Sequence, residues 1–162
     1  MKYILISIGF FISSNVYAQI GKSKKVDKIT EVGRVERILG DYISVYTLSF
    51  LEKDGNDFYC LAFTNEQTLY ADNSPDQKIL TFTATQDEFD YFYNFLLEGF
   101  EEEQFRYLEV GQDTVKTLPP ISTFLYIYVD FKDGTSASLK LTKRQLSQLF
   151  GKKMPKKKGK RK

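Results

Sequence analysis

The segment TQDEFDYFYNFLLEGF, residues 85–100, decides the fold class of this chain. Its large apolar side chains recur three and four residues apart, the spacing of a helix with one buried face. Thr85 followed by Glu88 matches a capping box. We therefore predict a helix over about residues 86–101. An isolated amphipathic helix of this length is marginal in water, so we expect its apolar stripe to pack on a sheet.

The sequence on both sides of this helix predicts antiparallel hairpins. Residues 42–51 alternate, residues 53–56 read Lys-Asp-Gly-Asn, and residues 58–64 resume the β-rich run. Asp-Gly between two such runs is a strong hairpin signal. Further strands are predicted over residues 29–38, 79–84, 105–110, 114–118, 123–131 and 136–141.

A second, shorter helix is predicted at the end of the folded region, over about residues 142–150, with Thr142 as its cap and Gly151 as its stop. The architecture that buries both helices is an α+β fold, an antiparallel sheet of hairpins with the helices packed on one face. Consecutive hairpins argue against a parallel doubly wound sheet. Hairpin, strand and Thr-capped helix occur in this order twice, but the side chains of the two stretches do not align well.

The N-terminus predicts export. Lys2 precedes a mostly apolar run over residues 3–12, and Val16 and Ala18 occupy the −3 and −1 positions of a cleavage site. The run is shorter than the about 18 to 20 apolar residues that cross a bilayer. We expect residues 1–18 to be a Sec signal peptide cleaved after Ala18, and the mature chain to be periplasmic or extracellular. Residues 19–150 then form one domain.

Charge is segregated along the chain. Residues 19–139 carry 21 acidic and 11 basic side chains, whereas residues 140–162 carry 11 basic and none acidic. Residues 151–162 are predicted to be a disordered basic tail. Its cationic residues are Lys152, Lys153, Lys156, Lys157, Lys158, Lys160, Arg161 and Lys162.

Three interpretations of the tail stay open. It binds a polyanion, such as an anionic membrane surface, lipopolysaccharide or nucleic acid. It folds over the acidic body of its own or a neighbouring chain. Or it is a solvated terminus without a dedicated partner.

The composition excludes several kinds of catalytic site, metal site and disulfide. The 162 residues include no His and a single Cys, which excludes Ser-His-Asp and Cys-His catalysis, imidazole zinc sites and a disulfide framework. Cys60 lies in an expected strand without a nearby cation and is interpreted as a core residue, with an intermolecular disulfide as the alternative. No metal site and no small-molecule cofactor are predicted, because the acidic loops match turns better than a calcium loop.

Acids are the only plentiful catalytic side chains. A secreted hydrolase with paired carboxylates is therefore the enzymatic alternative. The candidate acids are Asp87, Glu88, Asp90, Glu101 and Asp130, with Glu102 and Glu103 beside Glu101. Capping, the helix dipole and solvation account for most of them.

Tyrosines suggest a contact surface. Tyr42 and Tyr46 share one face of a predicted strand, and Tyr126 and Tyr128 share a face of another. If these faces lie opposite the helices, they form a Tyr-lined open surface, and Tyr is favoured at interfaces. The alternatives are ordinary cross-strand aromatic packing and stacking on a carbohydrate. We therefore expect a non-enzymatic, exported binding domain whose partner is an unknown macromolecule, with the basic tail adding adhesion to an anionic surface.

Overall fold

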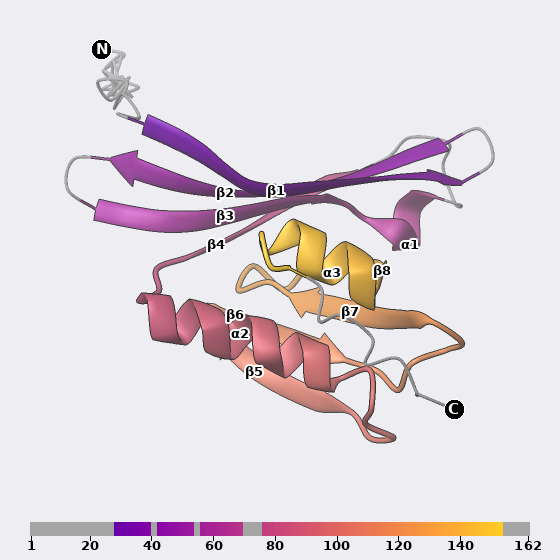
Figure 1. Cartoon of the computed structure of the whole chain (residues 1–162). Helices are drawn as coiled ribbons and strands as arrows, with labels where there is room; N and C mark the ends of the chain where they lie inside the picture. The colour runs from indigo at the N-terminus through magenta and orange to yellow at the C-terminus, as the bar shows by residue number, and fades with distance from the viewer. Residues whose placement is uncertain (1–27, 40–41, 54–55, 70–75, 154–162) are drawn as a thin grey trace, which may run out of the picture.

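A computed structural model describes residues 28–39, 42–53, 56–69 and 76–153 and shows two four-stranded antiparallel sheets (Figure 1). Sheet A contains, in spatial order, β1 (Lys28–Leu39), β2 (Tyr42–Lys53), β3 (Asn56–Thr64) and β4 (Gln77–Phe82). Sheet B contains β5 (Arg106–Val110), β6 (Asp113–Thr117), β7 (Phe124–Asp130) and β8 (Ser136–Thr142). The helices are α1 (Glu66–Leu69), α2 (Gln86–Glu98) and α3 (Lys143–Leu149).

Both predicted helices are confirmed, each with slightly shorter bounds. At the start of α2, the Thr85 side chain accepts from the Glu88 amide at 3.3 Å, and the Glu88 carboxylate accepts from the Thr85 amide at 2.8 Å. Thr142 forms the same reciprocal cap with Gln145 at the start of α3. Gly151, at φ +63°, ends α3 as expected of a residue that must adopt a left-handed conformation.

The mixed α+β class agrees with the prediction, but the expectation of one continuous sheet is wrong. After β4 the chain enters α2, and the strands that follow α2 pair only among themselves in the described region. Each sheet is thus built from strands that are neighbours in sequence. Pairing of such strands loses the least chain entropy, because the loops between them are short. Each half of the chain is a four-stranded meander followed by a Thr-capped helix, so the repeated order seen in the sequence corresponds to a repeated arrangement of elements.

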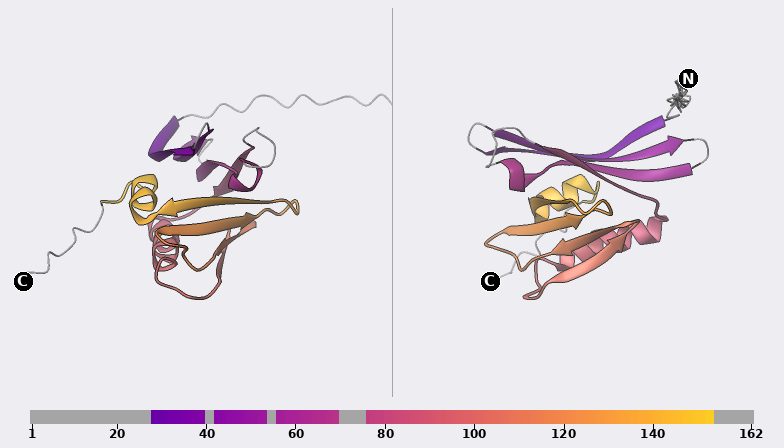
Figure 2. Two further views of the ribbon diagram at one scale, coloured as in Figure 1. Left: turned by 90° about the vertical axis from the view of Figure 1, so that its right-hand side faces the viewer. Right: turned by 180° about the vertical axis from the view of Figure 1, so that it is seen from behind.

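The core lies where the two sheets and two helices converge. α3 lies between sheet A and sheet B, and α2 lies along sheet B (Figures 1 and 2). One small apolar void is lined by side chains from all four of these units. Examples are Leu80 of sheet A, Leu96 of α2, Ile127 of sheet B and Leu149 of α3. The inner face of sheet B therefore meets both helices. Its other face is exposed over β5 and β6, whereas Arg37 and Glu66 contact it at Phe124 of β7 and Lys140 of β8.

The contact between β1 and α3 requires a glycine. The register between β1 and β2 shifts between Glu31 and Gly33, which marks a bulge. A Cβ on Gly33 would lie 2.2 Å from the Gln148 carbonyl oxygen and 2.4 Å from that of Leu149. The Gln148 side-chain amide also donates to the Arg34 carbonyl at 2.7 Å. The bulge lets the backbone of α3 approach that of sheet A closely.

We predict that Gly33→Ala destabilises the fold, because the added carbon meets backbone atoms that cannot rotate away. Overpacking of this kind costs about 1–3 kcal/mol. Urea unfolding followed by circular dichroism should show the loss, whereas Thr30→Ala, at an exposed position of the same strand, should change stability by less than about 0.5 kcal/mol. Equal urea midpoints for the two variants would show that the close contact between β1 and α3 does not contribute to stability.

Candidate binding surface

The open face of sheet B carries a row of aromatic and cationic side chains. The strand register places Tyr107 of β5 beside Lys116 of β6, and Lys116 beside Tyr128 of β7. Their sequence neighbours Val115, Ile127 and Val129 are buried, so this row points away from the core. Tyr107 is 74% exposed. The rear view in Figure 2 shows strands β5–β8 in front of α2, that is, from the side of this open face.

More aromatic side chains belong to the same surface. Tyr126 alternates with the buried residues of β7 and is half-buried on the open face. Phe105, which precedes β5, is 73% exposed. We call the set formed by Phe105, Tyr107, Lys116, Tyr126 and Tyr128 the aromatic face. It combines large contact area with phenol hydroxyls, the composition that favours recognition of another macromolecule.

Charges of both signs accompany these rings. Lys116 forms an exposed ion pair with Asp130, and the Lys140 Nζ lies 5.8 Å from the centre of the Tyr126 ring. Thr114 donates to the carboxylate of Glu109 on the same face. A partner would therefore meet aromatic area flanked by groups that can donate and accept hydrogen bonds.

Of the four tyrosines singled out in the sequence, the structure places two on the aromatic face. Tyr126 and Tyr128 lie there, whereas the Tyr42 side chain is outside the described residues. The expectation that Tyr46 contributes to an open surface is wrong, because Tyr46 is fully buried on the inner face of sheet A. Sequence reasoning missed Tyr107 and Phe105. Residues 105–110 alternate in the sequence, but only the pairing of β5 with β6 and of β6 with β7 places Tyr107 in one row with Tyr128.

A buried carboxylate explains the position of Tyr46. The Glu66 side chain, 7% exposed, forms ion pairs with Arg37 of β1 and, at 3.2 Å, with Lys140 of β8. Tyr46 donates its hydroxyl proton to the same carboxylate. Burial, reinforced by this carboxylate, raises the pKa of Tyr46 above its ordinary value, so the phenol stays protonated. The cluster links β1 and β2 of sheet A to β8 of sheet B.

Four of the other candidate acids have structural partners: Glu88, Asp90, Glu101 and Asp130. Hydrogen bonds from Thr85 lower the pKa of Glu88, and contact with Lys143 lowers that of Glu101. A hydrogen bond from Lys152, at 2.6 Å, lowers the pKa of Asp90. Asp130 is held by Lys116. These acids therefore work as caps and ion-pair partners in this structure.

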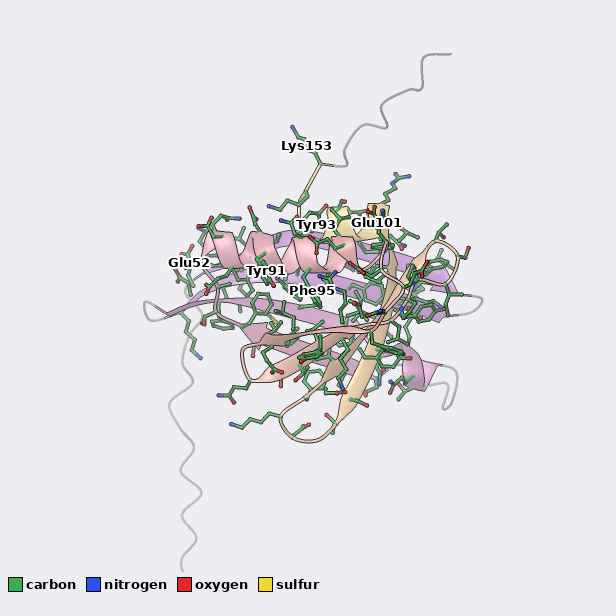
Figure 3. All side chains as sticks on the ribbon, turned by 90° about the horizontal axis from the view of Figure 1, so that it is seen from below. Glu52, Tyr91, Tyr93, Phe95, Glu101 and Lys153 are labelled. Atoms are coloured by element: carbon green, nitrogen blue, oxygen red, sulfur yellow. The ribbon has the colours of Figure 1, made fainter. Side chains whose placement is uncertain are left out.

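The basic segment begins later than the sequence indicated. Lys152, assigned to the tail, donates its amide to the Ser147 carbonyl at 2.8 Å and places its ammonium beside Asp90 and above the rings of Phe89 and Tyr93. Lys153 is exposed and projects away from the body of the molecule (Figure 3). The other six cationic tail residues lie outside the described residues. Lys152 thus anchors the segment on α2 rather than belonging to a free tail.

Cys60 lies on the outer face of sheet A, between Ser49 of β2 and Thr81 of β4. It is half-buried, and burial raises the pKa of its thiol. The neighbours Tyr59 and Leu61 point into the core instead. The interpretation of Cys60 as a core residue is therefore wrong: the strand register puts it on the opposite face.

A groove of about 520 Å³ lies between residues 35–38 of β1 and α3, beyond the close contact at Gly33. Arg37, Phe124, Arg144, Gln145 and Gln148 are among its lining residues. The Arg37 guanidinium stacks 5.1 Å from the centre of the Phe124 ring and is already neutralised by Glu66. We therefore interpret this groove as the outer side of the joint between the sheets.

No family model matches the chain, and neither the curated proteins nor the solved structures searched contain a significant match. None of the helices in the described part of the chain is long and apolar enough to cross a bilayer. The described residues also contain no group of three or more Cys, Asp or Glu side chains placed to hold a metal ion.

We predict that Lys152→Ala raises the pKa of Asp90 toward its ordinary value, since the lysine favours the ionised carboxylate. The lowered pKa means that this contact stabilises the fold at neutral pH and is lost as the pH falls through the Asp90 pKa. Titration of side-chain carboxyl carbons by NMR measures the shift. Glu101, held by Lys143, is the internal control and should shift only in Lys143→Ala. An unchanged Asp90 titration in Lys152→Ala would contradict the anchor.

We also predict that Glu66→Ala costs about 3–5 kcal/mol, because it leaves the buried Arg37 guanidinium unpaired. The double variant Arg37→Met with Glu66→Leu should recover much of this loss. Glu52→Ala, which breaks the exposed pair with Lys28, should cost less than about 1 kcal/mol. Denaturant unfolding measures all three, and an equal cost for Glu66→Ala and Glu52→Ala would show that the cluster does not hold the sheets.

Proposed function

We propose that the chain is an exported, non-enzymatic binding domain that contacts a macromolecular partner through the aromatic face of sheet B. The observation that carries the proposal is the row formed by Tyr107, Lys116 and Tyr128 across three strands, on the face opposite the helices. Tyrosines flanked by charges supply contact area together with hydrogen bonds. The face is built on paired strands, so its side chains are presented with little loss of backbone freedom on binding.

In this proposal the basic C-terminal segment adds electrostatic adhesion to an anionic surface. The sequence beyond Lys153 contains six cationic residues and none acidic. Near an anionic bilayer each contributes about 1 kcal/mol at low salt. The anchoring of Lys152 to Asp90 sets the point on α2 from which this segment departs. The N-terminal signal peptide would bring the domain to the compartment where such surfaces are found.

The test is a comparison of alanine variants of the aromatic face. The chain starting at Gln19 is immobilised and exposed to cell-envelope extract, and captured components are identified by mass spectrometry. Tyr107→Ala and Tyr128→Ala should each weaken capture of the same component about 5-fold or more, since truncating an interface hot spot costs over 1 kcal/mol. Tyr91→Ala, which removes an exposed Tyr from α2, should leave capture unchanged.

Truncation after Lys153 separates the two surfaces in the same experiment. The truncated chain should retain capture through the aromatic face but lose salt-sensitive retention on vesicles containing phosphatidylglycerol. Capture that is the same for wild type, Tyr107→Ala and Tyr128→Ala would show that the aromatic face is not the binding site. Vesicle retention that survives the truncation would remove the tail from the proposal.

A further inference from the structure

The outer face of sheet A is open and carries many apolar side chains. In Figures 1 and 2 sheet A forms one layer of the molecule, and no other described element lies on its outer side. Four isoleucines on this face are more than half exposed: Ile29, Ile38, Ile43 and Ile79. Half-buried apolar side chains continue the surface between them, namely Val45, Leu51, Phe58, Cys60 and Ala62.

This composition differs from that of a sheet whose outer face meets only water. Such a sheet has polar residues on the solvated side. In β2 the inner face carries Tyr46 and Leu48, yet the outer face carries Ile43, Val45 and Leu51, with the small polar residues Thr47 and Ser49 between them. Strands that are apolar on both faces are typical of sheets covered on both sides. A second layer is therefore expected over sheet A.

The charges on this face also limit what can cover it. The outward residues of β2 from Ile43 to Leu51 and of β3 from Phe58 to Ala62 are uncharged, as are Ile79 and Thr81 on β4, and the charged Lys53 lies at the end of β2. On β1, Arg34 and Glu36 form an ion pair at 2.7 Å, and Glu31 is a further exposed charge at this edge of the sheet. The charges thus lie on β1 and at the end of β2, and the centre of the face is uncharged. This centre offers no electrostatic recognition to a charged partner, but it is complementary to another copy of itself.

The size of the face matches what a stable dimer needs. A residue of a sheet covers roughly 16 Å² of its plane, from about 3.3 Å along the strand and about 4.8 Å between strands. The strands of sheet A are 12, 12, 9 and 6 residues long, so the face spans about 600 Å². Two copies would together bury about 1,200 Å² or more, the lower limit for specific interfaces.

We propose that two copies of this chain associate through the outer faces of their A sheets, forming a two-layer packing of sheets about 10 Å apart. The interface is isologous, so each copy presents the same residues to the other. Ile43, Ile79 and Cys60 lie within it. This surface is separate from the aromatic face of sheet B and does not depend on the function proposed for that face.

Sedimentation of the purified chain from low micromolar to several hundred micromolar concentration tests the proposal. Wild type should reach the mass of a dimer, and Ile79→Lys and Ile43→Lys should remain monomeric over the same range. Both isoleucines are 57% exposed in the single chain, so the variants should fold, which circular dichroism checks. Ile121→Lys makes the same change at a residue that is 62% exposed outside sheet A, and it should dimerise like wild type.

A second readout needs no variant. Labelling of Cys60 by a thiol reagent should slow as the concentration of wild-type chain rises, because the dimer covers it, and should not depend on concentration in Ile79→Lys. A monomeric wild type at the highest concentration, or a dimeric Ile79→Lys, would overturn the proposal. So would a wild-type monomer that binds neutral phosphatidylcholine vesicles through Ile79, since the face would then be a lipid contact. Tyr107→Ala should dimerise normally whether or not the aromatic face binds a partner.

Discussion

The buried carboxylate of Glu66 fixes how the two sheets meet. A charge taken out of water is tolerated only when it is paired and hydrogen-bonded, and the groups that satisfy it here come from β1, β2 and β8. Arg37 also donates to the Lys140 carbonyl at 2.9 Å, and the Asn65 side chain accepts from the Ser138 amide at 3.0 Å. Apolar packing alone tolerates sliding, whereas these contacts are directional. The four-residue helix α1 is therefore the joint that sets sheet B under sheet A and determines where its aromatic face points.

Local signals account for what the sequence could predict. The period of three and four residues between Phe89 and Leu96, and the pairs Thr85–Glu88 and Thr142–Gln145, act within one or two helical turns. For this reason both helices were predicted with their caps. The hairpins could be predicted for the same reason, because alternating side chains and an Asp-Gly turn are also signals between near neighbours in the sequence. The division into two sheets could not be predicted, since it depends on which strand edges remain unpaired after α2 has carried the chain away from β4.

Long-range contacts account for the rest. Arg37 and Lys140 are 103 residues apart in the chain, and nothing in the sequence around either residue indicates that they share a carboxylate. The orientation of β2 was ambiguous for a different reason. Alternation separates Tyr46 and Leu48 from Ile43 and Val45, but both sets are apolar or aromatic, so the pattern does not say which set is buried. In the structure Tyr46 and Leu48 are buried, and Ile43 and Val45 lie on the exposed outer face of sheet A.

The two open faces suit different kinds of contact. Stable interfaces between identical chains are more apolar than transient ones, and the outer face of sheet A has that character, whereas the aromatic face of sheet B mixes rings with charges. The two faces belong to different sheets and point away from the shared core, so a pair joined through sheet A would keep both of its aromatic faces accessible. Two linked binding faces raise the effective affinity for a partner that carries repeated sites, without any new contact. The anchoring of Lys152 on α2 holds the start of the basic segment on the helical side of the molecule. An extended surface with repeated anionic and hydrogen-bonding groups is the kind of partner that such an arrangement would hold best.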